Sequence, residues 1–255
     1  MITKSWVTQV KIEAELQFRS SVVIFLVFAF LALSSVVTQY FLPDIIQLSG
    51  LDIVNLPEPS MQGAFEDVWG DFLFTGAIVV IFIGSASISQ YFGADRPIYF
   101  LLSRPLSRND YYYARSAVRG ISLLAILQLT SILVYILGSI LFDPIDFAIV
   151  VSSSLVLGLA LTSFLFMLQM VNTRLETFPT VGVGIVVLVI MTLISLLSGY
   201  LDFLTWFSPF SLASIWPAIL HDQDYSRFWI NSLALVIWNA VPLYIGSLLF
   251  RNRDI

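Results

Sequence analysis

The sequence has 255 residues, of which 58% are hydrophobic and only 11% carry a charged side chain. Soluble domains have about 25% charged residues, and a mean hydropathy of +0.90 also places the chain among integral membrane proteins. The formal net charge is −5, but the acidic residues gather in one set of loops, so this charge does not bear on nucleic-acid binding, and no nucleic-acid partner is expected. Cysteine is absent, which excludes a disulfide framework, a thiolate nucleophile and a cysteine-ligated metal site.

Residues 1–19 have the pattern of an amphipathic helix. Polar residues, among them Lys4 and Arg19, recur on one stripe at helical spacing, and apolar residues gather opposite, with Glu13 interrupting the apolar face. No small-residue cleavage pattern follows the next apolar run, so the segment does not resemble a signal peptide. We expect an interfacial helix with its basic residues toward lipid headgroups; the alternative is a frayed cytoplasmic tail.

Charge-free runs of about 20 residues predict six membrane-spanning helices. The expected spans are residues 20–42, 72–92, 120–141, 147–171, 177–200 and 228–250. A seventh run, residues 203–221, is shorter and is interrupted by Pro209 and Pro217. It therefore predicts a broken, re-entrant hairpin on the outer side before the last span. The expected fold is an all-α membrane protein with one transmembrane domain over residues 1–255.

The basic residues are strongly segregated. With six spans, eleven of the twelve Lys and Arg residues fall on the side that holds both termini and the central loop, residues 93–119, and only Arg227 falls on the other side. The positive-inside rule places the termini and this loop in the cytoplasm, and we expect a multi-pass protein of the plasma membrane. If residues 203–221 crossed the bilayer, the segregation would be lost after the fifth span, which favours the hairpin.

The central loop combines five arginines with aromatic residues. Pro105 cannot lie within a helix, so the short helical pieces before and after it are expected to form an angle. The second piece begins at Ser107, where Asp110 three residues later completes an acidic form of the capping box. A basic, aromatic and bent loop between two spans is typical of a segment that binds a partner.

Few residues could carry chemistry within the membrane. The expected spans contain no Asp, Glu, Lys, Arg or His, which argues against a proton-driven transporter and an intramembrane hydrolase. The lone His221 lies in the hairpin beside Asp222 and Asp224; an exposed interfacial histidine is the simpler interpretation, and an acid–base or metal role is the alternative. The only lysines are Lys4 and Lys11, so the phosphate-binding pattern ending in Gly-Lys is absent. If the protein uses ATP, another chain must bind it.

The segment Leu-Leu-Ser-Arg-Pro-Leu-Ser-Arg at residues 101–108 resembles the cytoplasmic loop of exporter-class (type-two) ABC transporter permeases. The amphipathic N-terminus, the six spans and the hairpin containing Ser208 and Pro209 are similar in layout. Where the family has an acidic residue followed by Gly-Thr, this chain has Asp95, Arg96 and Pro97, a departure at the contact region.

The resemblance implies that the loop is a coupling element that docks in a groove of a separate ATP-hydrolysing subunit. It implies an assembly of two permease subunits, identical or related, with two ATPases, and it places ATP and Mg²⁺ in the partner, with no catalytic residue, metal or cofactor in this chain. The implied coupling residues are Asp95, Arg96, Tyr99, Leu102, Arg104, Pro105, Arg108 and Asp110. The tyrosines at 111–113 either add contact area to the docked partner or belong to an aromatic belt at the membrane interface.

The expected function is therefore the membrane-spanning permease subunit of an ATP-driven exporter, surrounded by membrane lipid. Its spans offer almost no polar wall, so we expect a hydrophobic or amphipathic cargo. The aromatic residues of the hairpin are expected to form an outer gate: Trp206, Phe207, Phe210 and Trp216. Two alternatives remain: a membrane-embedded enzyme that acts on lipids near His221, and a subunit that transmits force or signal without transport.

Overall fold

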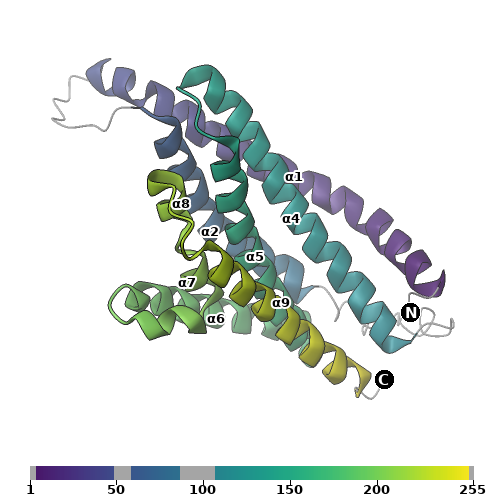
Figure 1. Ribbon diagram of the computed structural model, residues 1–255. Helices are drawn as coiled ribbons and strands as arrows, with labels where there is room; N and C mark the ends of the chain where they lie inside the picture. Colours follow the sequence, from purple (N-terminus) through teal and green to yellow (C-terminus); the bar gives the residue numbers. More distant parts are fainter. Residues whose placement is uncertain (1–3, 49–58, 87–106, 253–255) are drawn as a thin grey trace.

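The computed structural model describes residues 4–48, 59–86 and 107–252, and all regular structure in these residues is helical (Figure 1). The elements in chain order are α1 (Lys4–Leu48), α2 (Met61–Ser85), α4 (Arg108–Leu141), α5 (Phe147–Asn172), α6 (Thr177–Ser198), η2 (Asp202–Phe207), α7 (Pro209–Ala213), α8 (Trp216–Asp222) and α9 (Phe228–Arg251). Six of these helices, α1, α2, α4, α5, α6 and α9, are long and apolar enough to cross a membrane. The predicted all-α fold with six spanning helices is confirmed.

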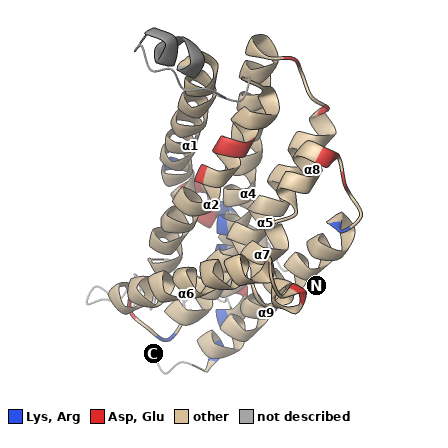
Figure 2. Cartoon of the chain, turned by 90° about the vertical axis from the view of Figure 1, so that its left-hand side faces the viewer, with Lys and Arg blue, Asp and Glu red and all other residues tan. Residues whose placement is uncertain are grey.

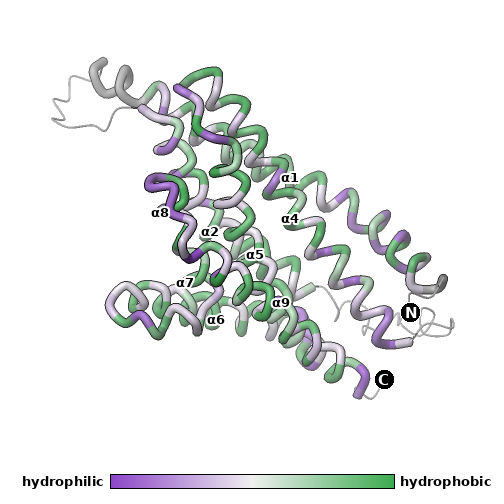
Figure 3. The backbone as a smooth tube through the Cα atoms, viewed as in Figure 1, coloured by the Kyte–Doolittle hydropathy of each residue, from purple (hydrophilic) through white to green (hydrophobic). Residues whose placement is uncertain are grey.

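The helices pack around α5. It contacts α2, α4 and α9, and most of its residues are buried, whereas half of the residues of α6 are exposed and only four are buried. α1 packs along α4, and both termini lie toward the same end of the bundle (Figure 1). In Figure 2 most acidic segments lie in the upper half and most basic segments in the lower half. Hydrophobic residues line the long helices, and hydrophilic ones concentrate in α8 and toward helix ends (Figure 3).

The core near the middle of the bundle is built from large aromatic side chains. Phe28 of α1 meets Phe72 of α2 edge-on, with ring centroids 4.9 Å apart. Trp69 of α2 is also buried, and its indole N–H donates to the Ser153 hydroxyl of α5 at 3.2 Å. This bond satisfies the one polar group of the tryptophan, so the ring can be buried without an unpaired donor.

α1 has no break where the sequence predicts the end of an interfacial helix. It runs continuously from Lys4 to Leu48, and no proline or glycine occurs between Lys4 and Leu42 to interrupt it. The stretch that the sequence assigns to the interface is therefore the first part of the long helix. Gln9 and Glu13 of this part are buried, so its inner face is covered by protein.

α4 begins where the capping signal predicts. The Ser107 hydroxyl accepts a hydrogen bond from the Asp110 backbone N–H at 3.0 Å, which satisfies one of the free donors of the first turn. The helix then continues without interruption to Leu141. Residues 108–119, which the sequence analysis assigns to the central loop, are thus the first turns of a spanning helix.

The predicted break between the fifth and sixth spans is confirmed. η2, α7 and α8 have six, five and seven residues, so none of them can cross a membrane. Ser208 caps α7 by accepting from the Phe210 N–H at 3.2 Å, and Pro209 occupies the first turn. Pro217 lies in the first turn of α8 in the same way. The depth of this segment in the bilayer remains a prediction.

Candidate functional site

The proposed coupling residues fall into two groups. Six of them lie outside the described residues: Asp95, Arg96, Tyr99, Leu102, Arg104 and Pro105. The other two, Arg108 and Asp110, form the first turn of α4. Arg108 Nη1 donates to the Arg251 carbonyl oxygen at 3.1 Å, which joins the start of α4 to the last turn of α9.

The tyrosines at 111–113 pack inside the chain. Tyr111 and Tyr112 are 2% and 0% exposed, and their rings lie 6.0 and 5.9 Å from the ring of Phe250 in α9. Tyr113 shares a hydrogen bond with the Ser247 hydroxyl at 2.9 Å. Both expectations for Tyr111 and Tyr112, a partner contact and an interfacial belt, are wrong, because α9 covers this face of α4.

A buried ion pair joins α4 to α1 beside these tyrosines. Arg115 Nη1 lies 2.9 Å from Glu13 Oε2, and the two side chains are 4% and 7% exposed. Glu13 Oε1 also accepts from Gln9 Nε2 at 3.0 Å, and Arg115 Nη1 donates to the Tyr111 hydroxyl at 3.3 Å. The sequence pattern did not predict this cluster. Its one signal was the position of Glu13 on the apolar face of the N-terminal helix.

A third contact joins α4 to the end of α2. Arg119 Nη1 donates to the Ile83 carbonyl oxygen at 2.8 Å, so the last turn of α2 is tied to α4 at a point about three turns after α4 begins. We call the contacts of Arg108, Arg115 and Arg119, together with those of Tyr111–113, the α4 junction. Through this junction the start of α4 is held to α1, α2 and α9. A displacement of the start of α4 would therefore be passed to three other helices.

The four residues of the predicted outer gate have different environments. Trp206 and Phe207 are 51% and 60% exposed, whereas Phe210 and Trp216 are only 6% and 8% exposed. Phe210 packs edge-on against Phe164 of α5, with centroids 5.7 Å apart. Phe210 and Trp216 are buried because α7 and α8 pack onto α5, and a gate formed by the four residues stays a prediction.

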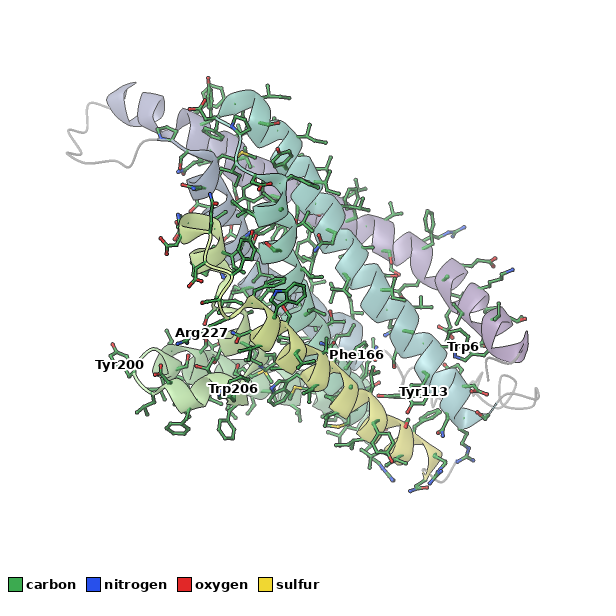
Figure 4. All side chains as sticks on the ribbon, viewed as in Figure 1. Trp6, Tyr113, Phe166, Tyr200, Trp206 and Arg227 are labelled. Atoms are coloured by element: carbon green, nitrogen blue, oxygen red, sulfur yellow. The ribbon has the colours of Figure 1, made fainter. Side chains whose placement is uncertain are left out.

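Two cavities border this segment. A mainly apolar cavity of about 220 Å³ lies between α2, α6 and the α7–α8 segment. A second cavity of about 530 Å³, with a mixed polar and apolar lining, lies between α6, η2, the α7–α8 segment and α9. We call it the polar cavity because charged residues, Asp202 and Arg227, line it together with Trp206 and others. Figure 4 shows Trp206 and Arg227 on one side of the molecule, and Trp6 and Tyr113 toward the opposite end.

His221 is paired with an acidic residue that its sequence neighbours do not reveal. Its Nε2 lies 3.3 Å from Glu66 Oε2 of α2, and both side chains are partly exposed. Nearby, the Ser226 backbone N–H donates to the Asp224 carboxylate at 2.8 Å, and this bond lowers the pKa of Asp224 below its ordinary value. Within residues 4–48, 59–86 and 107–252, no group of three His, Asp or Glu residues could hold a metal ion.

The arrangement defines a multi-pass all-α membrane protein with a tightly joined helix cluster at the end that holds both termini. No family model matches the chain, and no curated protein matches it.

Proposed function

We propose that the chain is the membrane-spanning subunit of an ATP-driven exporter of the ABC class, in which a separate subunit hydrolyses ATP. Two features support the proposal: the resemblance of residues 101–108 to the permease coupling loop, and the six helices long enough to span a membrane. The observation that carries it furthest is the α4 junction, because the resembling segment leads directly into the helix that this junction holds.

The junction offers a route by which force on the loop could reach the membrane domain. Residue 104 lies four positions before Arg108, which contacts α9, and the Arg115–Glu13 pair follows two turns later. Exposed ion pairs contribute only about 0–1 kcal/mol, but a buried pair holds two helices in a fixed register because separating its charges is costly. A push on the start of α4 would thus move α1 and α9 with it rather than fraying the helix.

The remaining parts of the proposal follow from charge and composition. The segregation of the basic residues favours a cytoplasmic location for both termini and the loop, where ATP is present. A second copy of the chain or a related permease completes the transport path in the plasma membrane. Because the outer faces of the spanning helices are rich in Leu, Ile, Val and Phe, a hydrophobic or amphipathic cargo fits better than a hydrophilic solute.

Purification of the tagged chain from its native membranes in mild detergent tests the proposal. We expect a P-loop ATPase subunit to co-purify, with ATP hydrolysis that orthovanadate inhibits. A chain that is recovered intact, without a second subunit and without ATPase activity, would contradict it. A P-loop ATPase in the adjacent reading frame would be independent support.

The contact between His221 and Glu66 favours a second candidate, a membrane-embedded enzyme acting on lipids. A histidine held by a carboxylate can serve as a general base, and the pair joins the end of α8 to the first turns of α2. This candidate predicts lipid turnover by the purified chain without ATP, and loss of that turnover in His221→Gln. Turnover that survives the substitution would remove the candidate.

A further inference from the structure

The two cavities beside the α7–α8 segment adjoin each other. Both are lined by Ser195 of α6 and by Ser214, which follows α7. These two serines therefore form the boundary between an apolar space and a polar one. Ser214 donates its hydroxyl proton to the Ser211 carbonyl oxygen at 2.6 Å, so it presents no free donor to an apolar group that passes it.

The apolar cavity has the lining of a site for a hydrocarbon chain. Its walls are Gly70, Leu73, Phe74, Leu188, Thr192, Phe210, Trp216 and Pro217, in addition to the boundary serines. Phe210 and Trp216 are almost fully buried, so this wall is fixed by the core rather than by mobile surface side chains. Gly70 leaves room in the wall, since a Cβ added there meets nothing within 4 Å.

The polar cavity carries one charge of each sign. Asp202 at the start of η2 and Arg227 at the start of α9 line it together. Among the residues that the structure describes, no direct ion pair joins Asp202 to Arg227. Arg227 also lies close enough to Asp224 to favour the charged form of the Asp224 carboxylate. Asn231, which is 4% exposed, lines the same space, and its Nδ2 is fixed by donating to the Leu212 carbonyl oxygen at 2.9 Å.

We propose that the two cavities form one binding site for a single-chain amphiphile with a zwitterionic headgroup. The hydrocarbon chain occupies the apolar cavity, the anionic group of the head faces Arg227, and its ammonium group faces Asp202. An arginine is suited to phosphate because its guanidinium donates two parallel hydrogen bonds. The buried apolar wall supplies affinity, and the few fixed polar groups supply orientation. Identification of this ligand as the cargo rests on the proposed function, whereas binding itself does not.

Equilibrium binding to the purified full-length chain in detergent tests the site with three probes that share one acyl chain: lysophosphatidylcholine, lysophosphatidylglycerol and monoacylglycerol. We expect lysophosphatidylcholine to bind most tightly. Arg227→Gln should weaken both phosphate-bearing probes about tenfold, the effect of losing one charge-assisted contact. Asp202→Asn should weaken only lysophosphatidylcholine. Neither variant should alter the binding of monoacylglycerol.

The apolar half is tested by Gly70→Phe, which adds a ring at a residue that lines the apolar cavity and should weaken binding of all three probes. Gly182→Phe in α6 is the matched control, because a Cβ at Gly182 also meets nothing within 4 Å and Gly182 lines neither cavity. Equal loss in the control, or binding that is indifferent to Arg227→Gln, would overturn the proposal and indicate lipid bound around the surface. If Gly70→Phe does not fold, the two charge variants decide, since both positions are exposed.

A last arm separates cargo from structural lipid. The assay follows fluorescent lysophosphatidylcholine in proteoliposomes that contain the chain and its ATPase. If ATP drives movement of this lipid and Arg227→Gln abolishes the movement, the site is a cargo site. If binding depends on the headgroup but no such movement occurs, the site exists and its ligand is a resident lipid. The exporter proposal is then judged by its own ATPase test.

Discussion

Glu13 of α1 and Arg115 of α4 form a buried ion pair, with 2.9 Å between Glu13 Oε2 and Arg115 Nη1. The two residues are 102 positions apart in the sequence. Two neutral groups also bond to the pair: Gln9 Nε2 donates to Glu13, and Arg115 donates to the Tyr111 hydroxyl. Since one charge left alone at this depth would be strongly destabilised, the pair fixes how α1 and α4 lie against each other.

Removing one partner of this pair should be costly. Glu13→Leu or Arg115→Met alone should lower the free energy of unfolding by about 3–5 kcal/mol, because the remaining buried side chain loses the opposite charge that this ion pair supplies. The double variant should recover most of this loss, since an apolar pair of similar size leaves no buried charge. Thermal unfolding of the purified variants in detergent measures both effects. Single variants as stable as the native chain would show that water reaches the pair.

The contact between α4 and α9 depends on a glycine. A Cβ added at Gly246 would overlap the Tyr112 hydroxyl and would lie 2.7 Å from its Cζ. Tyr112 is fully buried and cannot move aside easily, so Gly246→Ala should destabilise the protein by about 1–3 kcal/mol, the usual cost of overpacking. Gly182→Ala, where the Cβ meets nothing within 4 Å, is the control in the same unfolding measurement.

A second substitution tests whether the overlap with the Tyr112 hydroxyl causes the loss of stability in Gly246→Ala. Tyr112→Phe removes the overlapping oxygen, so it should restore part of the stability of Gly246→Ala while changing that of the native chain little. Equal stability of Gly246→Ala and Gly182→Ala would mean that α9 is not held against α4 at this point.

The spanning helices can be predicted from the sequence because a charge-free run of about 20 residues has no comparably stable alternative in a bilayer. The start of α4 is also predictable, because a serine followed by an acidic residue three positions later is a local capping signal. The break before α9 follows equally from local chemistry, since Pro209 and Pro217 cannot continue a helix.

The packed contacts cannot be predicted in the same way. Glu13 on an apolar face indicates a polar partner, but nothing local indicates that the partner is Arg115 of another helix. The tyrosines at 111–113 and the aromatic residues of the hairpin have the composition of a membrane interface. Whether such a residue is exposed, as Trp206 is, or buried in the core, as Phe210 is, depends on which helix lies over it.

This difference between the gate residues can be measured. Phe210→Ala should lower the free energy of unfolding by about 3–5 kcal/mol, because it leaves a cavity beside Phe164. Trp206→Ala should leave stability nearly unchanged, since the side chain is half exposed and the carbonyl that accepts from Trp238 is retained. In a reconstituted complex with its ATPase, Trp206→Ala should weaken stimulation of ATP hydrolysis by amphiphiles. Unaltered stimulation would exclude Trp206 from the gate.

The native chain lacks cysteine, so single cysteines report topology directly. Ser107 and Asn252 lie beside the Arg108–Arg251 contact, whereas Gln62 at the start of α2 lies near Leu220 of α8. An impermeant thiol reagent applied to intact cells should label a cysteine at position 62 and spare cysteines at 107 and 252. Labelling at 107 from outside would reverse the orientation and remove the basis for cytoplasmic coupling.

The most direct test of the coupling role of the loop measures ATP hydrolysis by the complex that co-purifies with the chain. It compares the native chain with the double variant Arg104→Glu, Arg108→Glu. The matched control is Lys11→Glu, Arg19→Glu, which reverses the same number of charges at two exposed positions of α1. We expect the loop variant to insert but to lose most of the associated ATPase activity, because its reversed charges no longer suit the docking surface. The control should retain this activity. Equal ATPase in the native chain and both variants would contradict a coupling role for this loop.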